Sequence, residues 1–430
     1  MEILIKITHA KFQVKIDEVP FVRPKTGLSA MVGMSYNYIL TGLGIYAKPS
    51  KLCLPILFWR PTNMEVRIDK DTFLDGVQKV QGVVEAKGAM PILSHLLFTA
   101  EQDRIVIQAT DLEIGAKGYY AANVISNGEM VLNAKKLFDI LRELPREEVH
   151  LVKEDNHWVV LKCGKSKFRL PGMSPQDFPP FPEFSEDSLL EFSSKLLKEM
   201  IRKTFFAQSP DETRQALNGL LLEQDGGKVH MVGTDGHRLA IIRRDLGGGS
   251  KGDKLSYLIP KKALAELMKL IEDEDATFSF SAKNNHMAFI QGDQVIVSRK
   301  IDGKFPNYQQ VVPSDNKLQV HVNRDVLQHA LKRVALLADE KSKMVRFDIQ
   351  SGNMILTTDT TELGEAREEL AVSYSGEDVS VGLNAKYVLD VLNVIDDEEI
   401  VLNLKDQNSS CLITSNGDKD YQSIVMPMRL

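Results

Sequence analysis

The chain repeats one structural unit three times, and this repetition restricts the possible folds more than any other feature. One motif, a short strand running into an amphipathic helix, reads VRIDKDTFLDGVQKV in its first copy. It recurs as LEFSSKLLKEMIRKT and VHVNRDVLQHALKRV, so the three copies begin at residues 66, 190 and 320. A second motif of the same kind reads MVLNAKKLFDILREL, YLIPKKALAELMKLI and VGLNAKYVLDVLNVI and begins at residues 130, 257 and 381. Three copies of both motifs predict three related domains.

A Thr-Asp pair separates the two motifs in every copy. The pairs begin at residues 110, 234 and 358, so both intervals are 124 residues. Segments of alternating apolar and polar residues follow the helices, for example RIVIQAT and KVHMVGT, and this alternation is typical of half-buried strands. The sequence therefore predicts an α+β fold of three domains, each a doubled β-α-β-β-β unit, at residues 64–185, 188–314 and 318–430. The six expected helices are 70–82, 134–143, 194–206, 261–270, 324–337 and 385–394.

Residues 1–63 lie outside this repeat and differ from it in composition. They carry eight basic and three acidic residues, and they contain a charge-free stretch between Lys25 and Lys48. That stretch is long enough to cross a bilayer, but its Gly, Ser, Asn and Thr residues make it too polar for a convincing spanning helix. Because Met64 opens a well-patterned domain, we interpret residues 1–63 as a non-native or misassigned leader. A membrane anchor is the alternative.

Composition excludes several classes of protein. A hydrophobic content of 43% with 26% charged residues excludes a wholly disordered or collagen-like chain. The three cysteines, Cys53, Cys163 and Cys411, are too far apart in sequence for a disulfide framework or a C-x-x-C metal site. A reducing cytoplasmic compartment therefore fits best, and neither a metal nor a cofactor is expected.

The distribution of charge indicates a polyanionic partner. The formal net charge is −6, and since the first 63 residues contribute +5, residues 64–430 carry −11. An acidic body by itself argues against nucleic acid. The six expected helices, however, hold sixteen Lys and Arg residues against eight acidic ones, which leaves −19 for the rest of residues 64–430. Basic helices on an acidic shell suit a polyanion that is held on one side of the protein without sequence readout.

The helix expected at 194–206 shows how this charge is arranged. Lys195, Lys198 and Arg202 fall at i, i+3 and i+7 on one face, opposite an apolar stripe that includes Leu197 and Ile201. For one helix, a solvated surface is the simpler interpretation, whereas the same bias on six helices favours binding. Few aromatic residues accompany the basic ones, so the expected target is duplex backbone rather than stacked single strands.

Three further segments identify a family. They are GTDGHRLA at residues 233–240, DGKFPNY at 302–308 and VMPMRL at 425–430. Together with the three α+β domains and their basic helices, they closely resemble the bacterial DNA polymerase III beta subunit family, the replicative sliding clamps. The resemblance extends from Met64 to Leu430, and residues 1–63 have no counterpart in it.

The resemblance implies a head-to-tail homodimer that closes a ring of six domains, with helices lining the hole and sheets on the outside. Such a ring encircles duplex DNA, slides on it and tethers the polymerase, which confers processivity. The implied partners are the replicative polymerase alpha subunit, the clamp-loader complex, and other proteins with a clamp-binding motif, among them repair polymerases, ligase and mismatch-repair proteins. A clamp of this kind has no catalytic residues of its own.

Partners of this family insert a short peptide into an apolar cleft between the second and third domains. Methionine side chains adapt their shape readily, which suits a pocket that serves many peptides. Matched residue by residue, the implied cleft consists of Leu217, Thr234, Gly236, His237, Arg238, Leu239, Pro306, Val311, Ser410, Ile424, Val425, Met426, Pro427, Met428, Arg429 and Leu430. Gln310 stands where relatives in the family have Arg.

The resemblance also assigns DNA contacts, adding loop positions to the basic residues of the helices. The expected contacts are Lys87, Lys135, Lys136, Lys198, Arg202, Lys203, Arg214, Lys261, Lys262, Lys332 and Arg333.

The ring would close between unlike ends of the chain. A basic run at 162–169 and an acidic run at 362–369 carry opposite charges, which favours head-to-tail pairing. With the apolar residues that the resemblance supplies, the expected dimer interface contains Lys165, Lys167, Phe168, Leu336, Leu337 and Glu368. The alternative for either run is a solvated edge strand protected from aggregation.

Two other functions compete with the clamp. An enzyme is disfavoured, because the chain contains no G-x-x-x-x-G-K-[ST], H-E-x-x-H or G-x-S-x-G motif. A repeat-built adaptor that binds proteins but not DNA would explain the cleft, but it would not explain the segregation of positive charge onto the helices.

Overall fold

The computed structural model describes residues 3–7, 10–14, 63–85, 88–187, 190–225, 227–246, 254–271, 275–313 and 315–430. The chain divides into two units, Met1–Trp59 and Arg60–Leu430. In the first unit the described residues form an antiparallel pair of strands, β1 (Ile3–Ile7) and β2 (Ala10–Val14). The rest of the expected leader, including its charge-free stretch and Cys53, lies outside the described residues.

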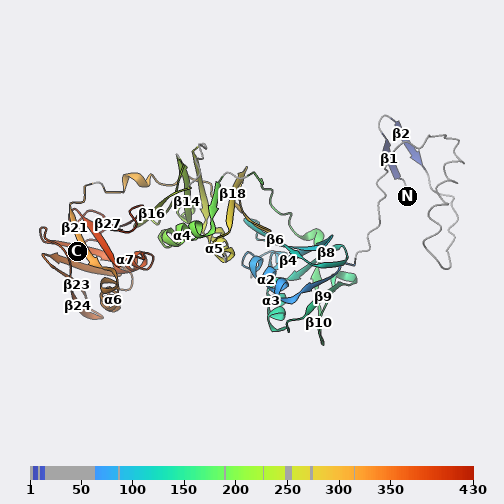
Figure 1. Ribbon diagram of the computed structural model, residues 1–430, viewed down its shortest axis with the longest axis horizontal. Coiled ribbons are helices and arrows are strands. Elements are labelled where there is room, and N and C mark those ends of the chain that lie inside the picture. The colour runs from blue at the N-terminus through green and yellow to red at the C-terminus, as the bar shows by residue number, and fades with distance from the viewer. Residues whose placement is uncertain are drawn as a thin grey trace. The chain divides into compact units, whose positions relative to one another are not determined.

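The described part of the second unit contains six α-helices (Figure 1). They are α2 (Lys70–Gln81), α3 (Ala134–Glu143), α4 (Ser194–Thr204), α5 (Lys261–Leu270), α6 (Arg324–Val334) and α7 (Ala385–Leu392). All six begin where the sequence predicts them. The helices α2, α4, α6 and α7 end one to three residues earlier than expected. After α4 and α6 a turn of 3₁₀-helix follows, η4 (Phe205–Ala207) and η7 (Ala335–Leu337).

Capping side chains explain most of the helix starts. A capping residue precedes five of the six helices, and its side-chain oxygen accepts the backbone N–H of the residue three positions further on. These capping residues are Asp69, Asn133, Ser193, Asn323 and Asn384. Helix α5 follows Pro260 and has no such cap.

Each domain contains eight strands in two sets, one set per helix. In the first domain they are β3 (Glu65–Asp69), β4 (His95–Glu101), β5 (Arg104–Thr110), β6 (Ile114–Ala121), β8 (Gly128–Asn133), β9 (Glu148–Lys153), β10 (Val159–Cys163) and β11 (Ser166–Leu170). In the second they are β13 (Leu190–Ser193), β14 (Gly219–Asp225), β15 (Lys228–Thr234), β16 (Arg238–Asp245), β17 (Leu255–Pro260), β18 (Thr277–Lys283), β19 (His286–Gln291) and β20 (Gln294–Arg299). In the third they are β21 (Leu318–Asn323), β22 (Met344–Gln350), β23 (Asn353–Thr360), β24 (Gly364–Ala371), β25 (Val379–Asn384), β26 (Glu399–Leu404), β27 (Cys411–Ser415) and β28 (Tyr421–Val425). The first domain adds two short strands, β7 (Asn123–Ser126) and β12 (Gly172–Met173).

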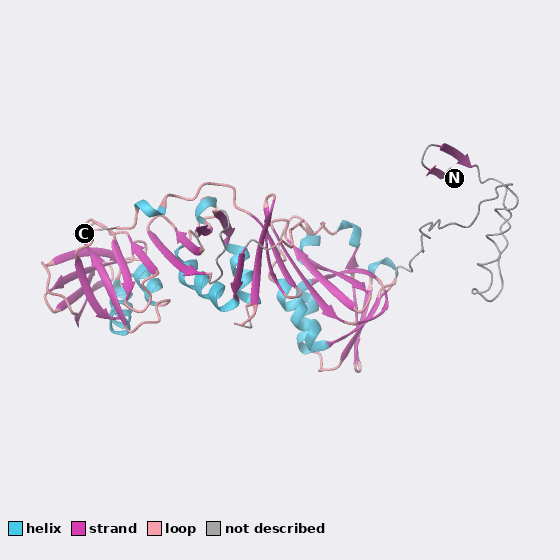
Figure 2. Cartoon of the chain, turned by 45° about the horizontal axis from the view of Figure 1, so that its top comes forward, coloured by secondary structure: helices cyan, strands magenta, loops and turns pink. Residues whose placement is uncertain are grey.

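The two halves of each domain exchange their first strands. In the second domain, β17 joins β14-β15-β16, and β13 joins β18-β19-β20. The same exchange gives β8-β4-β5-β6 and β3-β9-β10-β11 in the first domain, and β25-β22-β23-β24 and β21-β26-β27-β28 in the third. The two helices of each domain lie close together against these sheets (Figure 2). Each domain is therefore the doubled β-α-β-β-β unit that the repeat predicts.

Neighbouring domains are joined by strand pairing. Strand β6 pairs antiparallel with β20, and β16 pairs antiparallel with β28. These two pairs, which we call the first and second joints, make continuous sheets of nine and eight strands.

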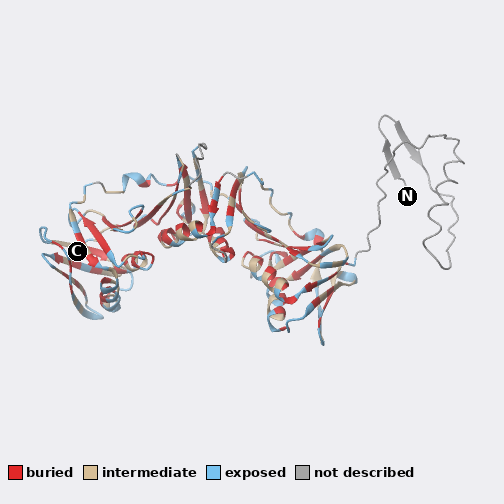
Figure 3. Ribbon diagram, in the orientation of Figure 1, coloured by how far each residue is buried: buried red, intermediate tan, exposed pale blue. Residues whose placement is uncertain are grey.

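The core lies between the helices and the sheets, as the buried faces in Figure 3 show. On α4, Leu197, Met200 and Ile201 are fully buried while Lys195 is exposed, which confirms the predicted amphipathic arrangement. Cys163 and Cys411 are buried free thiols, and burial raises the pKa of Cys411 to about 12.

Two absences can be stated for the described residues. They contain no cluster of His, Cys, Asp or Glu side chains that could hold a metal ion. Among the same residues, no helix combines the length and apolar character needed to span a bilayer.

Candidate functional site

An apolar cleft lies at the second joint, with a cavity volume of about 140 Å³. It is lined by Arg214, Leu217, Thr234, Gly236, Arg238, Leu239, Pro306, Tyr308, Val311, Ile424 and Met426. Nine of these belong to the cleft that the sequence predicts. Val311 is 37% exposed and stands at the surface, whereas Ile424 is buried. The cleft therefore offers an apolar ligand both an exposed rim and a buried wall.

A tight turn between β15 and β16 shapes one side of the cleft. The Thr234 hydroxyl donates to the Arg238 carbonyl (2.6 Å) and accepts the Gly236 N–H (3.1 Å). Asp235 Oδ1 accepts the N–H groups of His237 (2.8 Å) and Arg238 (3.1 Å). Gly236 has a φ of +92°, a conformation that side chains disfavour. The side chains of Thr234 and Asp235 and the conformational freedom of Gly236 are thus what this turn requires.

The Arg238 side chain connects the cleft to the third domain. It is 6% exposed, and its Nε donates to Asp235 Oδ2 (3.0 Å) while Nη1 donates to Asp390 Oδ2 on α7 (2.5 Å). The guanidinium also lies 4.4 Å from the Tyr387 ring centroid and 5.4 Å from that of Phe206. Two carboxylates and two aromatic faces therefore hold one buried cation at this joint.

The remaining predicted cleft residues do not line the cavity. Val425 is buried opposite Arg238 in the β16–β28 pair. His237 is exposed, and its backbone carbonyl accepts the Met426 N–H (2.9 Å). Beyond β28, the Met428 N–H donates to the Gly382 carbonyl (2.8 Å). Ser410, Pro427, Arg429 and Leu430 also lie outside the lining.

Two residues line the cleft that the sequence did not assign to it. Arg214, predicted as a DNA contact, donates to the Asp235 carbonyl (2.8 Å). Tyr308 was missed, although it ends the D-G-K-F-P-N-Y segment that helped to identify the family. Its hydroxyl donates to Glu223 (2.8 Å), and burial together with this carboxylate raises the pKa of Tyr308 to about 12. It therefore stays neutral and acts as a wall of the cleft.

The predicted DNA contacts differ in how accessible their charges are. Lys135, Lys136 and Lys332 are exposed, and Lys198 and Lys261 are half-buried. Arg202 forms a bidentate pair with Asp396, and Arg333 forms one with Glu368, both at the surface. Lys262 donates to Asp111 and to the Val83 carbonyl (3.0 Å) across the first joint. Lys87 lies outside the described residues.

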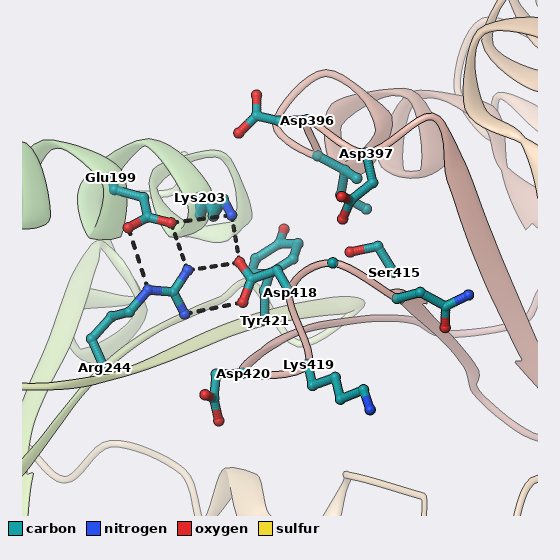
Figure 4. Close-up of a pocket in the computed structure, with 13 residues that line it drawn as sticks. Glu199, Lys203, Arg244, Asp396, Asp397, Ser415, Asp418, Lys419, Asp420 and Tyr421 are labelled. Atoms are coloured by element: carbon teal, nitrogen blue, oxygen red, sulfur yellow. Dashed lines mark hydrogen bonds and ion pairs between the residues drawn. The ribbon is translucent and has the colours of Figure 1, made fainter.

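Lys203 is not available to DNA, and this prediction is wrong. Its side chain is 6% exposed, and its Nζ pairs with Asp418 (2.5 Å) and Glu199 (3.2 Å). Arg244 bridges the same two carboxylates, at 2.7 and 2.5 Å (Figure 4). These four residues, which we call the joint ion cluster, connect α4 and β16 to the loop between β27 and β28. Lys203 therefore stabilises the second joint.

The acid dependence of stability should report on this cluster. Burial alone would raise the pKa of Asp418 and Glu199, but hydrogen bonds and charge from Arg244 and Lys203 outweigh it and hold both pKa values below the ordinary 3.8 and 4.5. The stabilisation is present above those ordinary values and is lost as the pH falls through the lower folded-state values. We expect Asp418→Asn to lose stability near neutral pH and to approach the native protein as the pH falls below those lowered folded-state pKa values. Thermal unfolding from pH 7 to 2 measures this.

The matched control is Asp420→Asn, at an exposed carboxylate in the same loop, and its stability should change with pH in parallel with that of the native protein. A parallel curve for Asp418→Asn would contradict the prediction.

The predicted dimer residues lie on two edge strands and on η7. Strand β11 ends one sheet and β24 ends another. Lys165 and Lys167 are exposed in the β10–β11 hairpin, and Phe168 is half-buried. Leu336 is 77% exposed and Leu337 is half-buried. Glu368 on β24 pairs with Arg333 of its own chain and keeps 29% of its side chain exposed.

Comparison with known proteins assigns the family. Three family models match in chain order: DNA polymerase III beta subunit, N-terminal domain (residues 64–182), central domain (191–307) and C-terminal domain (309–429). A beta sliding clamp of Pseudomonas putida is 33% identical over 368 residues, covering 85% of this chain and 100% of the relative. The crystal structure of the DNA polymerase III subunit beta from Pseudomonas aeruginosa superimposes with a TM-score of 0.82 at 33% identity and covers 85% of this chain and all of that one.

A second structure of the Pseudomonas aeruginosa clamp, bound to griselimycin, superimposes with a TM-score of 0.81 at 33% identity and covers 86% of this chain and all of that one. The sliding clamp is a non-catalytic component of DNA replication, which agrees with the absence of catalytic motifs in this sequence. From the domain architecture, the conserved spacing of its repeats and these matches together, the chain belongs to the DNA polymerase III beta subunit family of sliding clamps.

Proposed function

We propose that two copies of this chain close head to tail into a ring that encircles duplex DNA, slides on it and tethers the replicative polymerase. The observation that carries this proposal is a pair of edge strands. At the two joints, β6 pairs with β20 and β16 pairs with β28. The equivalent strands at the two ends of the repeat are β24 and β11, and each of them ends its sheet in this chain. Pairing β24 of one copy with β11 of the next would repeat the same joint a third time.

The repeat also gives a register for this third joint. Thr234 lies opposite Leu239 and Thr358 opposite Ala366, so Ala366 is the equivalent of Leu239. In the same way, Gln291 lies opposite Gln294 in the β19–β20 hairpin, as Cys163 lies opposite Ser166 in the β10–β11 hairpin. Gln294 and Ser166 are therefore equivalent. Three residues further along each strand, Arg169 on β11 is the equivalent of Val297 on β20. At the first joint Val297 lies opposite Gly115, which is the equivalent of Leu239 because it lies opposite Thr110. Ala366 would therefore face Arg169 of the second copy. Two residues further along, Glu368 would face Lys167.

Opposite charges meet in that register. Glu368 and Lys167 were both expected at the interface from the sequence, and the strand equivalence supports pairing them without using their charges. Cross-strand pairs of opposite charge stabilise a sheet, and like ends of the chain would bring equal charges together. Head-to-tail closure is therefore favoured over pairing of two β11 strands or two β24 strands.

An exposed apolar side chain, Leu336, would contribute an apolar contact to the third joint. Leu336 occupies the second position of η7, as Phe206 does in η4. Phe206 packs beneath Arg238 at the second joint, whereas Leu336 is 77% exposed in the single chain. A leucine this exposed, at a position whose equivalent Phe206 is half-buried and contacts Arg238 at the second joint, is expected to pack against a second copy.

The helices would supply the DNA-facing surface. Lys135, Lys136, Lys261 and Lys332, from three different helices, carry accessible or partly accessible ammonium groups that can meet phosphates without reading sequence. Because the ring would be held on DNA by topology, these contacts can stay weak enough to permit sliding. Arg202 and Arg333 could join them only by exchanging Asp396 and Glu368 for phosphate.

The cleft would serve as the docking site for proteins that act with the clamp. Its apolar lining and Met426 suit short peptides from several partners, for which the polymerase alpha subunit, the clamp loader and repair proteins are the candidates. Griselimycin, bound by a related clamp, is a ligand for the same site in this proposal. The compartment would be the cytoplasm, where the buried thiols stay reduced. The alternative, an adaptor without DNA encirclement, shares the cleft but leaves the edge strands unexplained.

Linearisation of loaded DNA tests encirclement directly. The protein is loaded with a clamp loader and ATP onto nicked circular duplex, half of the sample is cut with a restriction enzyme, and both halves are separated by gel filtration. We expect the protein to stay with the intact circle and to leave the linear molecule. Equal retention on both would indicate ordinary electrostatic binding, and binding to neither would favour the adaptor.

A further inference from the structure

The cleft and the second joint share one charged group, and this suggests a role for a residue outside the cleft. We propose that Asp390 on α7 is a positioning residue for ligand binding in the cleft, because it fixes the guanidinium of Arg238 from across the joint. The inference rests on the proposed docking function and adds a dependence of docking on the contact between the second and third domains.

Arg238 links the cleft to the second joint because its side chain takes part in both. Its side chain lines the cavity, yet its Nη1 donates to Asp390 and its planar head lies between the rings of Tyr387 and Phe206. Asp390 itself does not line the cavity. A change at Asp390 can therefore reach the ligand only through Arg238 or through the packing of α7.

Losing the Asp390 charge would release the Arg238 head. A buried guanidinium needs compensating charge, and Asp235 alone would have to supply it. The open direction for the freed head is the cavity, where it can reach water. Since the cavity measures only about 140 Å³, a cation that turns into it removes much of the apolar space available to a ligand.

Asp390 is also the carboxylate that can be changed cleanly. Asp235 holds the turn through two backbone N–H groups, so replacing it would distort the cleft directly. Apart from Arg238, Asp390 pairs with Lys386 (2.8 Å), whose side chain is 63% exposed. Removing Lys386 therefore offers a control that alters the other contact of Asp390 and leaves Arg238 alone.

The first joint shows that this cation is not a general requirement of the fold. There the equivalent turn follows Thr110, and Asp111 accepts the Ile114 N–H as Asp235 accepts that of Arg238. The residue at the Arg238 position is thus Ile114, which is buried and uncharged. A buried cation occurs at the joint that carries the apolar cleft and is replaced by an aliphatic side chain at the first joint.

Coupling of this kind must act in both directions. If the position of Arg238 affects the ligand, then a bound ligand must stabilise the contact between Arg238 and α7 by the same free energy. A ligand in the cleft should therefore slow hydrogen exchange in α7, which it does not touch.

The test compares griselimycin binding to the native clamp and four variants by titration calorimetry. For Asp390→Asn we expect the dissociation constant to rise roughly fivefold or more. Asp390→Glu should recover most of the affinity, and Lys386→Gln should bind like the native protein. Equal affinity of Asp390→Asn and the native protein would overturn the inference.

Two further measurements keep the outcomes separate. The variant Val311→Asp places a charge on the rim of the cleft and should abolish binding. If it binds normally, the cleft is not the docking site, and the docking function fails together with this inference. If it loses binding while Asp390→Asn does not, only the inference fails. In the native protein, unchanged hydrogen exchange of residues 385–392 on adding griselimycin would also overturn it, whatever the variants do to folding.

Discussion

If the chain forms the proposed head-to-tail dimer, replacing Leu336 by aspartate is expected to convert it into a monomer. Leu336 is the most exposed of the large apolar side chains among the described residues, and the repeat places it where Phe206 packs at the second joint. A carboxylate at that position would be desolvated without a partner, at a cost of about 3 kcal/mol. The dimer dissociation constant should therefore rise on the order of a hundredfold. Sedimentation velocity over a range of protein concentrations measures it directly.

A second exposed aliphatic residue provides the matched control. Val326 lies on α6, the helix that precedes η7, and is 50% exposed. The same substitution, Val326→Asp, adds the same charge to the same helical segment, and an acidic residue is well tolerated in a first helical turn. Val326→Asp should remain dimeric. If Leu336→Asp sediments like Val326→Asp, the third joint does not use η7 and the head-to-tail arrangement loses its apolar contact.

The repeat made most of the fold predictable from the sequence. The apolar periodicity located each helix to within three residues at its end, and an Asp, Asn or Ser precedes every helix except α5, which follows Pro260. The equal spacing of the repeats did not predict the length of one hairpin. The Thr-Asp pairs recur every 124 residues, but Thr358 lies opposite Ala366 whereas Thr234 lies opposite Leu239, so the third hairpin is three residues longer. The spacing of motifs cannot reveal a turn that lengthens beyond the motif.

The candidate sites were predictable only where a local sequence builds them. The T-D-G-H-R turn encodes its own hydrogen bonds, and four of its five residues, all except Asp235, were assigned to the cleft from sequence. Lys203 failed because its partner Asp418 is 215 residues away and belongs to another domain. Periodicity places Lys203 beside Arg202 at one end of a basic helix, but it cannot show which of the two turns toward a neighbouring domain. Contacts between domains decide that, and they depend on the assembled sheets.

The joint ion cluster is expected to be the main electrostatic support of the second joint. Removing one member of a buried charge network leaves the others uncompensated, which typically costs 3–5 kcal/mol. Arg244 is the best member to remove, because it contacts both Glu199 and Asp418, and only Lys203 would remain to balance two carboxylates. Its side chain is 19% exposed, which places the expected cost of Arg244→Ala near the lower end, about 3 kcal/mol.

Hydrogen exchange can localise this effect, since each joint is a ladder of strand-to-strand hydrogen bonds. In Arg244→Ala the amides that pair β16 with β28 should exchange on the order of a hundredfold faster, which corresponds to about 3 kcal/mol. The amides that pair β6 with β20 should not change, because the group equivalent to Arg244 at the first joint is the neutral Tyr120, whose hydroxyl donates to Gln294 (3.0 Å). The first joint thus serves as an internal reference in the same sample.

The adjacent residue separates the loss of charge from the loss of side-chain volume. Arg243 lies beside Arg244 on β16 and donates to the neutral Gln422 (2.8 Å). Arg243→Ala removes a guanidinium of the same size from the same strand without leaving a buried carboxylate unpaired, so the exchange at the second joint should change far less. If the two alanine variants accelerate exchange equally, the joint is held by strand pairing and apolar packing. If only Arg244→Ala does so, a network of four charges, one of them (Asp418) on a loop of the third domain, controls how firmly the cleft-bearing joint is closed.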